Sequence, residues 1–220
     1  MKINFFNHIA KNIATIMNGG KETTETPPKQ LQFSEIEKAI MSIFVSLIQL
    51  DKNFSAELQK NILQFLQTNF GENILREKQL EKIFKQDAMP YLRIACNHAK
   101  SSLSHHSIDL IVQQLFFLAN ESYFISTKKI HHIHRIAQYL GISKTQLHTL
   151  EANAFAALAI DKEFIFDTDA PFETNNKKYK KLILKFHPDR AAQDDKIAHE
   201  KFIVLQQSFA AFKRKYYPEL

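Results

Sequence analysis

The residue types best suited to a specific contact lie together in residues 177–190, KKYKKLILKFHPDR. His187 and Asp189 can exchange hydrogen bonds with a partner, and Pro188 between them cannot continue a helix. The lysines and Arg190 concentrate positive charge, which is compatible with nucleic acid, an anionic membrane surface or an acidic protein. The stretch therefore predicts an exposed binding element.

An amphipathic helix is predicted immediately before this His-Pro-Asp tripeptide. Its apolar stripe recurs at helical spacing and consists of Tyr179, Leu182, Ile183 and Phe186. Another face carries lysines at four-residue steps, namely Lys177, Lys181 and Lys185. Because Pro188 bars His187 from the helical region, we expect the helix to end at about Phe186 or His187 and the tripeptide to lie in an exposed loop.

A second amphipathic helix is expected after the loop, with Asp194 or Asp195 as its N-cap. Its apolar side chains are spaced to lie along one side and are Phe202, Leu205, Phe209, Phe212 and Tyr216. Two such helices joined by a loop predict an antiparallel helical hairpin. The preceding residues 161–174 contain acids, Pro171 and turn-forming residues, and we interpret them as a domain boundary.

The composition favours an all-α protein. The chain has 220 residues, 45% of them hydrophobic, which suffices for a sizeable core. Apolar residues recur with helical periodicity almost throughout, and strand-favouring runs such as residues 164–166 are short. The four glycines form no phosphate-binding loop, and no Ser or Cys lies in a nucleophile pattern. We therefore expect neither an enzyme nor a cofactor.

Several features favour a cytoplasmic location. The single cysteine, Cys96, excludes an internal disulfide, and its place in a helical pattern predicts a small buried side chain. No run of about eighteen apolar residues predicts a membrane-spanning helix. Polar residues interrupt the N-terminus too often for a signal peptide. The net charge of +6 and the pI near 9.2 do not by themselves select a partner.

Residues 1–32 are expected to contain a short helix and a linker. The helix would cover residues 3–17 and end at Gly19 and Gly20. Its apolar side could dock on the rest of the protein or lie at a membrane surface, but only Lys2 and Lys11 supply charge for the second role. Residues 21–32 are polar and proline-containing, which is typical of an extended linker.

Residues 33–160 predict a helical domain. Ser34 and Glu37 have the spacing of a capping box, and further helices are expected near residues 36–48, 55–71, 74–86, 91–101, 107–120, 127–141 and from residue 143 onward. A helix, a polar turn, a capped second helix and a glycine occur twice, ending at Gly71 and Gly141. This repeat predicts two helical hairpins that pack against each other. Residues 161–220 are expected to form a separate C-terminal domain.

The histidines and phenylalanines of this domain are interpreted as structural. His131, His132 and His134 could suggest a metal site, and His131 and His134 share a helical face. No Cys or carboxylate lies at ligand spacing beside them, so we prefer solvated or interface histidines to a metal site. The same interpretation applies to His98, His105, His106 and His148. The Phe-rich residues 115–118 are expected in the core.

Residues 179–212 resemble a J-domain, the module by which DnaJ-type co-chaperones engage heat-shock ATPases of the DnaK class. The tripeptide matches the signature loop, and residues 179–186 match the second helix, which usually has a YRKLALKYHPD-like sequence. The third helix is matched by Lys201, Phe202, Leu205, Phe209 and Phe212. The Y-x-x-L-G-like first helix of the family has no counterpart in residues 164–169, so this helix is divergent or missing.

Residues 33–155 look like a tellurite-resistance TerB-like domain, which accompanies a J-domain in DjlA-like co-chaperones. The resemblance rests on the repeated hairpin and on residues 124–143, FISTKKIHHIHRIAQYLGIS. In that family acidic residues near the turns between helices are associated with metal binding. Asp51 and Glu121 are therefore weak metal-ligand candidates, although the usual Asp-Gly pairs are missing.

The resemblance implies a co-chaperone that recruits and stimulates a DnaK-class ATPase, with the TerB-like domain as a targeting or scaffold module. It implies a partner-binding set of His187, Pro188, Asp189, Tyr179, Lys180, Lys181, Lys185 and Arg190. The alternative is a protein- or metal-binding scaffold or sensor with a vestigial J-like tail. Nucleic-acid binding by the lysines ranks last, because no RNA-binding signature is present.

Overall fold

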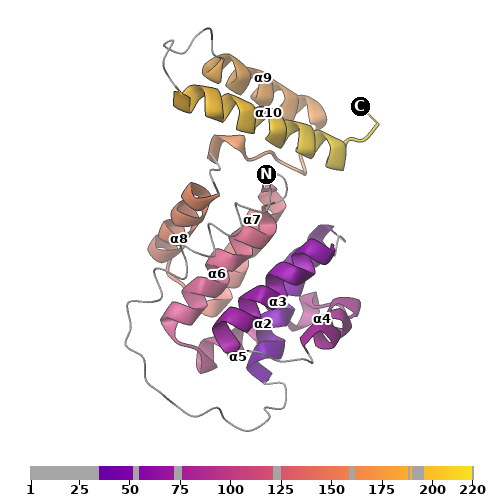
Figure 1. Ribbon diagram of the computed structural model, residues 1–220, viewed down its shortest axis with the longest axis vertical. Coiled ribbons are helices and arrows are strands. Elements are labelled where there is room, and N and C mark those ends of the chain that lie inside the picture. Colours follow the sequence, from indigo (N-terminus) through magenta and orange to yellow (C-terminus); the bar gives the residue numbers. More distant parts are fainter. Residues whose placement is uncertain are drawn as a thin grey trace. The chain divides into compact units, whose positions relative to one another are not determined.

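The computed structural model describes residues 35–51, 55–71, 76–120, 125–158, 162–187, 189 and 196–219, all within one unit, Phe33–Leu220. Every regular element in these ranges is a helix and none is a strand, which confirms the all-α prediction (Figure 1). The predicted N-terminal helix, the linker and the N-cap at Asp194 or Asp195 lie outside the described residues.

The helices correspond to those expected from the sequence periodicity. The first group consists of α2 (Glu35–Ile48), α3 (Ala56–Phe70), α4 (Arg76–Lys85), α5 (Leu92–Ser102), α6 (His105–Ala119), α7 (Thr127–Leu140) and α8 (Lys144–Ala157). The C-terminal group consists of α9 (Phe172–Phe186) and α10 (Lys196–Tyr216). Short 3-10 turns are η1 (Gln49–Asp51), η2 (Met89–Tyr91) and η3 (Lys162–Phe164). None of the described helices is long and apolar enough to cross a bilayer.

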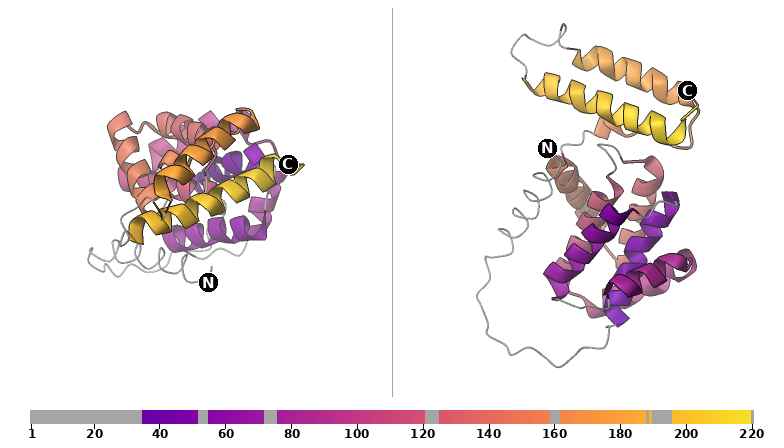
Figure 2. Two further views of the ribbon diagram at one scale, coloured as in Figure 1. Left: turned by 90° about the horizontal axis from the view of Figure 1, so that it is seen from above. Right: turned by 45° about the vertical axis from the view of Figure 1, so that its right-hand side comes forward.

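Helix α2 forms the centre of the helical body, by which we mean residues 35–158. Ile40, Ile43 and Phe44 are fully buried, because apolar residues occupy most of its circumference rather than one stripe. The helix packs most extensively on α5 and also contacts α3, α4, α6 and α7 (Figure 2). The predicted contact between the two repeated hairpins is therefore present, with α5 as a further neighbour of α2.

The repeated turns are built as the sequence indicates. Ser55 and Ser126 cap α3 and α7, each side-chain oxygen accepting a hydrogen bond from a backbone N–H in the first turn. Gly71 and Gly141 end these helices with φ angles of 76° and 81°, a region that residues with a Cβ rarely adopt. Ser143 caps α8 in the same way.

Glu37 of the predicted capping box and Gln146 in the first turn of α8 both bond to a side chain of another helix. Ser34 lies outside the described residues, and the buried Glu37 carboxylate pairs with the guanidinium of Arg76 at the start of α4. Arg76 also donates a hydrogen bond to the carbonyl of Gly71. Gln146 donates its side-chain amide to Asp109 of α6 at 2.6 Å. These side chains tie helices together, which is a tertiary role that local spacing cannot reveal.

His132 is a core residue, so its interpretation as a solvated or interface histidine is wrong. Its Nε2 lies 3.0 Å from Ser46 Oγ, and Ser46 donates its own hydroxyl proton to the carbonyl of Ile43. Arg135, which can only donate, lies 2.8 Å from His132 Nδ1. Nδ1 is therefore the acceptor, and Nε2 carries the proton that binds Ser46. Burial and the nearby Arg135 guanidinium lower the pKa of His132 from 6.5 to about 4.

This histidine predicts a loss of stability in mild acid. Because the folded pKa is below the unfolded value, the full contribution is present above pH 6.5 and is lost as the pH falls towards 4. The free energy of unfolding should fall by about 3 kcal/mol over this window on account of His132 alone. Urea denaturation at pH 7 and pH 4.5 measures this fall in the free energy of unfolding. The His132→Gln variant should have a lower free energy of unfolding than wild type at pH 7. Between pH 7 and pH 4.5 this free energy should fall less in the variant than in wild type. An equal loss in both proteins contradicts the assignment.

Candidate functional site

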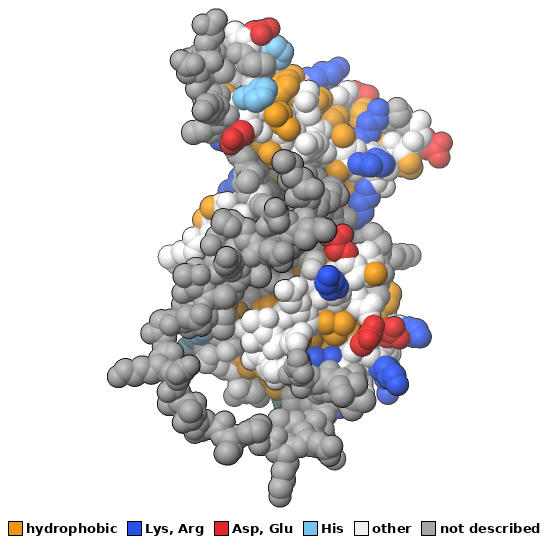
Figure 3. Space-filling view, in the orientation of Figure 1, with side chains coloured by type: hydrophobic (Ala, Val, Ile, Leu, Met, Phe, Trp, Pro, Cys, Tyr) orange, Lys and Arg blue, Asp and Glu red, His pale blue; other side chains and the backbone are white. Residues whose placement is uncertain are grey.

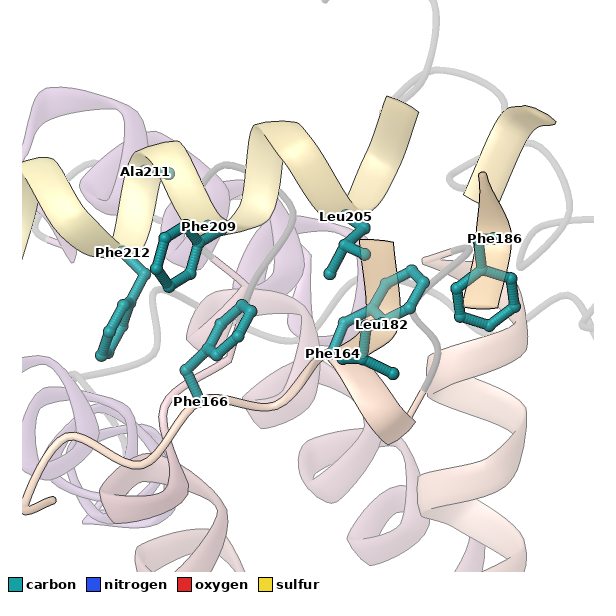
Figure 4. Packing of buried hydrophobic residues seen from close by; sticks show 8 residues of the cluster. All are labelled: Phe164, Phe166, Leu182, Phe186, Leu205, Phe209, Ala211 and Phe212. Atoms are coloured by element: carbon teal, nitrogen blue, oxygen red, sulfur yellow. The ribbon is translucent and has the colours of Figure 1, made fainter. Parts of the chain in front are cut away.

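Helices α9 and α10 form the predicted hairpin, and its core is dominated by aromatic side chains. Figure 4 shows side chains of both helices converging on those of the preceding segment. The buried cluster comprises Phe164, Phe166, Leu182, Phe186, Leu205, Phe209, Ala211 and Phe212. Tyr179, Ile183, Phe202 and Tyr216 are partly buried against it, as the apolar stripes predicted. Helix α9 ends at Phe186 and the backbone of His187 is extended, which confirms the predicted end.

The segment before α9 is part of this core, so its interpretation as only a domain boundary is incomplete. Phe164 and Phe166 are 1% and 0% exposed, and they pack against aromatic rings of α9 and α10 respectively. After η3 the backbone of residues 165–167 belongs to no helix. A 3-10 turn and a non-helical stretch that carry two buried phenylalanines therefore occupy the place where the first helix of a J-domain would lie.

Asn175 fixes this segment to α9. Its side chain is buried, with the residue 2% exposed, and it makes two hydrogen bonds to the backbone of Asp167. The amide of Asp167 donates to Asn175 Oδ1 at 2.9 Å, and Asn175 Nδ2 donates to the carbonyl of Asp167 at 2.7 Å. Tyr217 adds a second tie by donating its hydroxyl to the carbonyl of Ala170 at 2.7 Å. Asn175 and Tyr217 therefore supply hydrogen-bond partners to backbone groups of residues that belong to no helix.

Replacing Asn175 should therefore loosen the C-terminal segment. Asn175→Ala removes both hydrogen bonds and leaves the backbone groups of Asp167 without them, which should lower the free energy of unfolding by about 2 kcal/mol. Asn176→Ala, at the neighbouring half-exposed position, is the matched control and should change stability little. Urea denaturation followed by circular dichroism compares the two variants. Equal losses of stability in Asn175→Ala and Asn176→Ala would contradict the role of the two Asn175 hydrogen bonds in holding the segment to α9.

The described part of the tripeptide is held from two sides. The backbone N–H of Asp189 donates to His187 Nδ1 at 3.2 Å, and the imidazole meets the ring of Phe202 edge-on with centroids 5.5 Å apart. Because Nδ1 accepts a hydrogen bond, the proton of the neutral ring is on Nε2. The Asp189 side chain is 86% exposed. Pro188 and Arg190 lie outside the described residues.

The predicted lysines do not share one environment. Lys180 and Lys181 are exposed, and so is Lys177. Lys185, in contrast, donates to both carboxylate oxygens of Glu163 at 2.6 and 2.7 Å. The segment before α9 therefore engages one of the cations that we predicted to contact a partner.

Tyr179 has a packing role that its place in the predicted binding set did not indicate. Its ring stacks on Phe209 with centroids 4.0 Å apart and planes 6° apart. Burial raises the pKa of the Tyr179 hydroxyl. The side chain therefore stabilises the contact between α9 and α10, and only part of it is accessible to a partner.

Three contacts near the tripeptide were not foreseen. Phe202 was expected in the apolar stripe of the second helix, but not against the ring of His187. The ammonium groups of Lys185 and Lys201 lie 5.0 and 5.4 Å from the centre of the Phe186 ring. Such cation–π contacts stabilise the last turn before the loop. Helical spacing alone carries no signal for the contacts of Phe202 and Lys201, because they join two helices across a loop.

In the helical body a carboxylate lies near two of the histidines, although none was expected from the sequence spacing. Glu151 of α8 is buried, and its Oε2 lies 3.7 Å from both His134 Nε2 and His148 Nδ1, and 3.6 Å from Lys162 Nζ. Burial lowers the pKa of His134, and the Glu151 charge opposes this effect. Sequence spacing could not pair Glu151 with His134, because the two residues lie on different helices. Glu151 follows His148 by three positions on α8, and this spacing was overlooked.

The metal candidates receive no support from the described residues. In these ranges no group of three or more His, Cys, Asp and Glu side chains is arranged to hold a metal ion. Asp51 is the last residue of η1, but its side chain and the whole of Glu121 lie outside the described part. Metal binding by Asp51 and Glu121 stays a prediction.

The chain matches no protein-family model, and no curated protein or solved structure is significantly similar to it. Function is therefore inferred from the residues and the geometry of the α9–α10 hairpin.

Proposed function

We propose that the protein is a co-chaperone whose α9–α10 hairpin recruits a DnaK-class ATPase through His187, Pro188 and Asp189. The observation that carries the proposal is the His-Pro-Asp sequence directly after a basic amphipathic helix that ends at Phe186. The edge-on packing of His187 on Phe202 supports it, because the contact holds the imidazole beside the exposed Asp189.

The proposed docking depends on charge and hydrogen bonding rather than on covalent chemistry. Lys177, Lys180 and Lys181 are exposed and give α9 a positive face that attracts an acidic surface on the ATPase. His187 and Asp189 then supply directional hydrogen bonds at the contact. The hairpin accelerates hydrolysis only if it binds the hydrolysis-competent conformation of the ATPase more tightly than the other conformations.

The missing first helix does not count against docking. Phe164 and Phe166 fill the aromatic core from the segment before α9, so the two helices that carry the site have a third packing partner. In this proposal the segment replaces the packing role of the first helix. The J-like arrangement is therefore retained where the binding residues lie and is altered on the side of the segment.

The helical body is proposed to be the targeting or scaffold module, on its resemblance to a TerB-like domain. The two capped hairpins around α2 support this assignment, because they form a hydrophobic core of their own. A scaffold or sensor with an inactive hairpin is the alternative. The ion pair between Lys185 and Glu163 favours it, since that lysine is already engaged within the chain.

Single-turnover ATP hydrolysis by a purified DnaK-class ATPase tests the proposal. The wild-type chain should accelerate hydrolysis, and His187→Gln should reduce the acceleration about tenfold or more, because it removes a hydrogen bond at the contact. His199→Gln, an exposed histidine on α10, is the matched control and should behave like wild type. The proposal is lost if wild type has no effect or if His187→Gln is equally active. Binding without acceleration would favour the scaffold alternative.

A further inference from the structure

Helices α5 and α7 of the helical body carry no acidic residue. Neither helix contains an aspartate or a glutamate, whereas each of the other described α-helices contains at least one. Helix α4 shows the usual alternative, in which both signs of charge are mixed on the exposed side, and Figure 3 shows acidic and basic side chains next to each other on this part of the helical body. The charged side chains of α5 and α7 are therefore all basic.

The two helices are distant in sequence but pack against each other. A guanidinium nitrogen of Arg135 on α7 lies 3.9 Å from the sulfur of Met89, in the turn before α5. Near the other end, the side chain of Lys100 on α5 lies so close to Gly141 that a Cβ at Gly141 would come within 2.7 Å of Nζ. Arg93 precedes Lys100 by seven positions and shares its side of α5. Arg93, Lys100 and Arg135 therefore border the contact between α5 and α7, and we call them the basic row.

The charge of the basic row is not balanced within the described part of the chain. All three side chains are exposed, and no ion pair joins any of them to a described acidic residue. The nearest acids in the sequence of α5 are engaged elsewhere, because Asp87 accepts a hydrogen bond from the N–H of Met89 and Asp109 accepts one from Gln146. Uncompensated positive charge of this kind attracts an anionic surface.

Two apolar side chains flank the basic row and indicate which kind of anionic surface fits. Tyr91 and Ile94 are 62% and 67% exposed, more than any other large hydrophobic residue that the structure describes. Tyr91 has helical backbone angles, so the spacing of three positions makes the two side chains neighbours on α5. Ile94 follows Arg93 directly and points about 100° away from it around the helix. A phosphate backbone buries little aliphatic surface, whereas the headgroup region of a bilayer accepts tyrosine and isoleucine beside basic residues.

We propose that α5 and α7 bind the surface of an anionic lipid bilayer. The basic row contacts the negative headgroups, and Tyr91 and Ile94 enter the boundary between the headgroups and the acyl chains. Each cation near such a surface raises the partition coefficient about fivefold, and an inserted isoleucine raises it about tenfold, so the association is reversible. The proposal does not depend on the co-chaperone function, and it gives the helical body a target of its own.

Cosedimentation of the full chain with vesicles tests the role of charge. Wild type should bind vesicles of equal parts phosphatidylcholine and phosphatidylserine and should not bind pure phosphatidylcholine. The double variant Arg93→Gln, Lys100→Gln should lower the partition coefficient about thirtyfold, whereas Arg93→Lys, Lys100→Arg keeps the charge and should bind like wild type. Lys177→Gln, Lys181→Gln is the matched control on α9. It removes the same charge from the hairpin and should lower the partition coefficient less than about threefold, because salt screens distant charges.

The role of the apolar side chains is tested separately. Ile94→Gln should lower the partition coefficient about tenfold at every salt concentration, since burial of an apolar side chain depends little on ionic strength. Leu184→Gln, which removes a 51% exposed leucine from α9, is the matched control and should have no effect.

Several outcomes would overturn the proposal. Equal losses in the two glutamine double variants would assign binding to the overall charge of the chain, and an Ile94→Gln variant that binds like wild type would exclude insertion. Binding to a DNA duplex that is as tight as binding to the vesicles and is unaffected by Ile94→Gln would assign the basic row to nucleic acid. Binding that no variant changes would assign it to another part of the chain.

A further variant keeps the test valid if thermal melting shows that Arg93→Gln, Lys100→Gln is poorly folded. Asn97→Glu adds an acid at an exposed position of α5 and removes no side chain of the basic row. The new carboxylate follows Arg93 by four positions, a spacing that stabilises the helix. It should nevertheless lower the partition coefficient about fivefold, because it cancels one positive charge at the bilayer. Unchanged binding of Asn97→Glu would contradict the proposal.

Discussion

The aromatic packing between the segment before α9 and the two C-terminal helices is the interaction on which the candidate site depends. Two helices alone can bury only the stripes that face each other, and such a pair lacks a closed core. Phe164 and Phe166 supply the third side of this core, and Asn175 holds the segment by both backbone groups of Asp167. This packing fixes α9 and α10 side by side, and therefore the approach of His187 to Phe202.

The same segment determines which charges remain available at the surface. Glu163 binds Lys185, and the carbonyl of Ile165 accepts a hydrogen bond from Lys178 at 2.7 Å. The lysines on the side of α9 next to the segment are thus engaged within the chain. Lys180 and Lys181 are exposed, so the positive face offered to a partner is narrower than the row of lysines in the sequence indicates.

Local features of the chain could be predicted from sequence because short-range rules govern them. Helical periodicity located the helices, serine and glycine marked their ends, and Pro188 placed the end of α9. Contacts between distant residues were missed. Ser46 and His132 are 86 positions apart, and no local pattern pairs them. Residues 164–166 were too short for a periodic signal, so the core role of their phenylalanines became visible only in the packing.

Preorganisation of His187 lowers the cost of a contact between the loop and a partner. Ordering a mobile side chain at an interface costs about 0.5–1.5 kcal/mol, and this cost is subtracted from the binding energy. His187 is already held by the Phe202 ring and by the N–H of Asp189, and no hydrogen bond from a described residue occupies its Nε2. A partner that accepts a hydrogen bond from Nε2 therefore meets an imidazole whose orientation is set before contact. Phe202 of α10 and the backbone N–H of Asp189 in the loop set this orientation together.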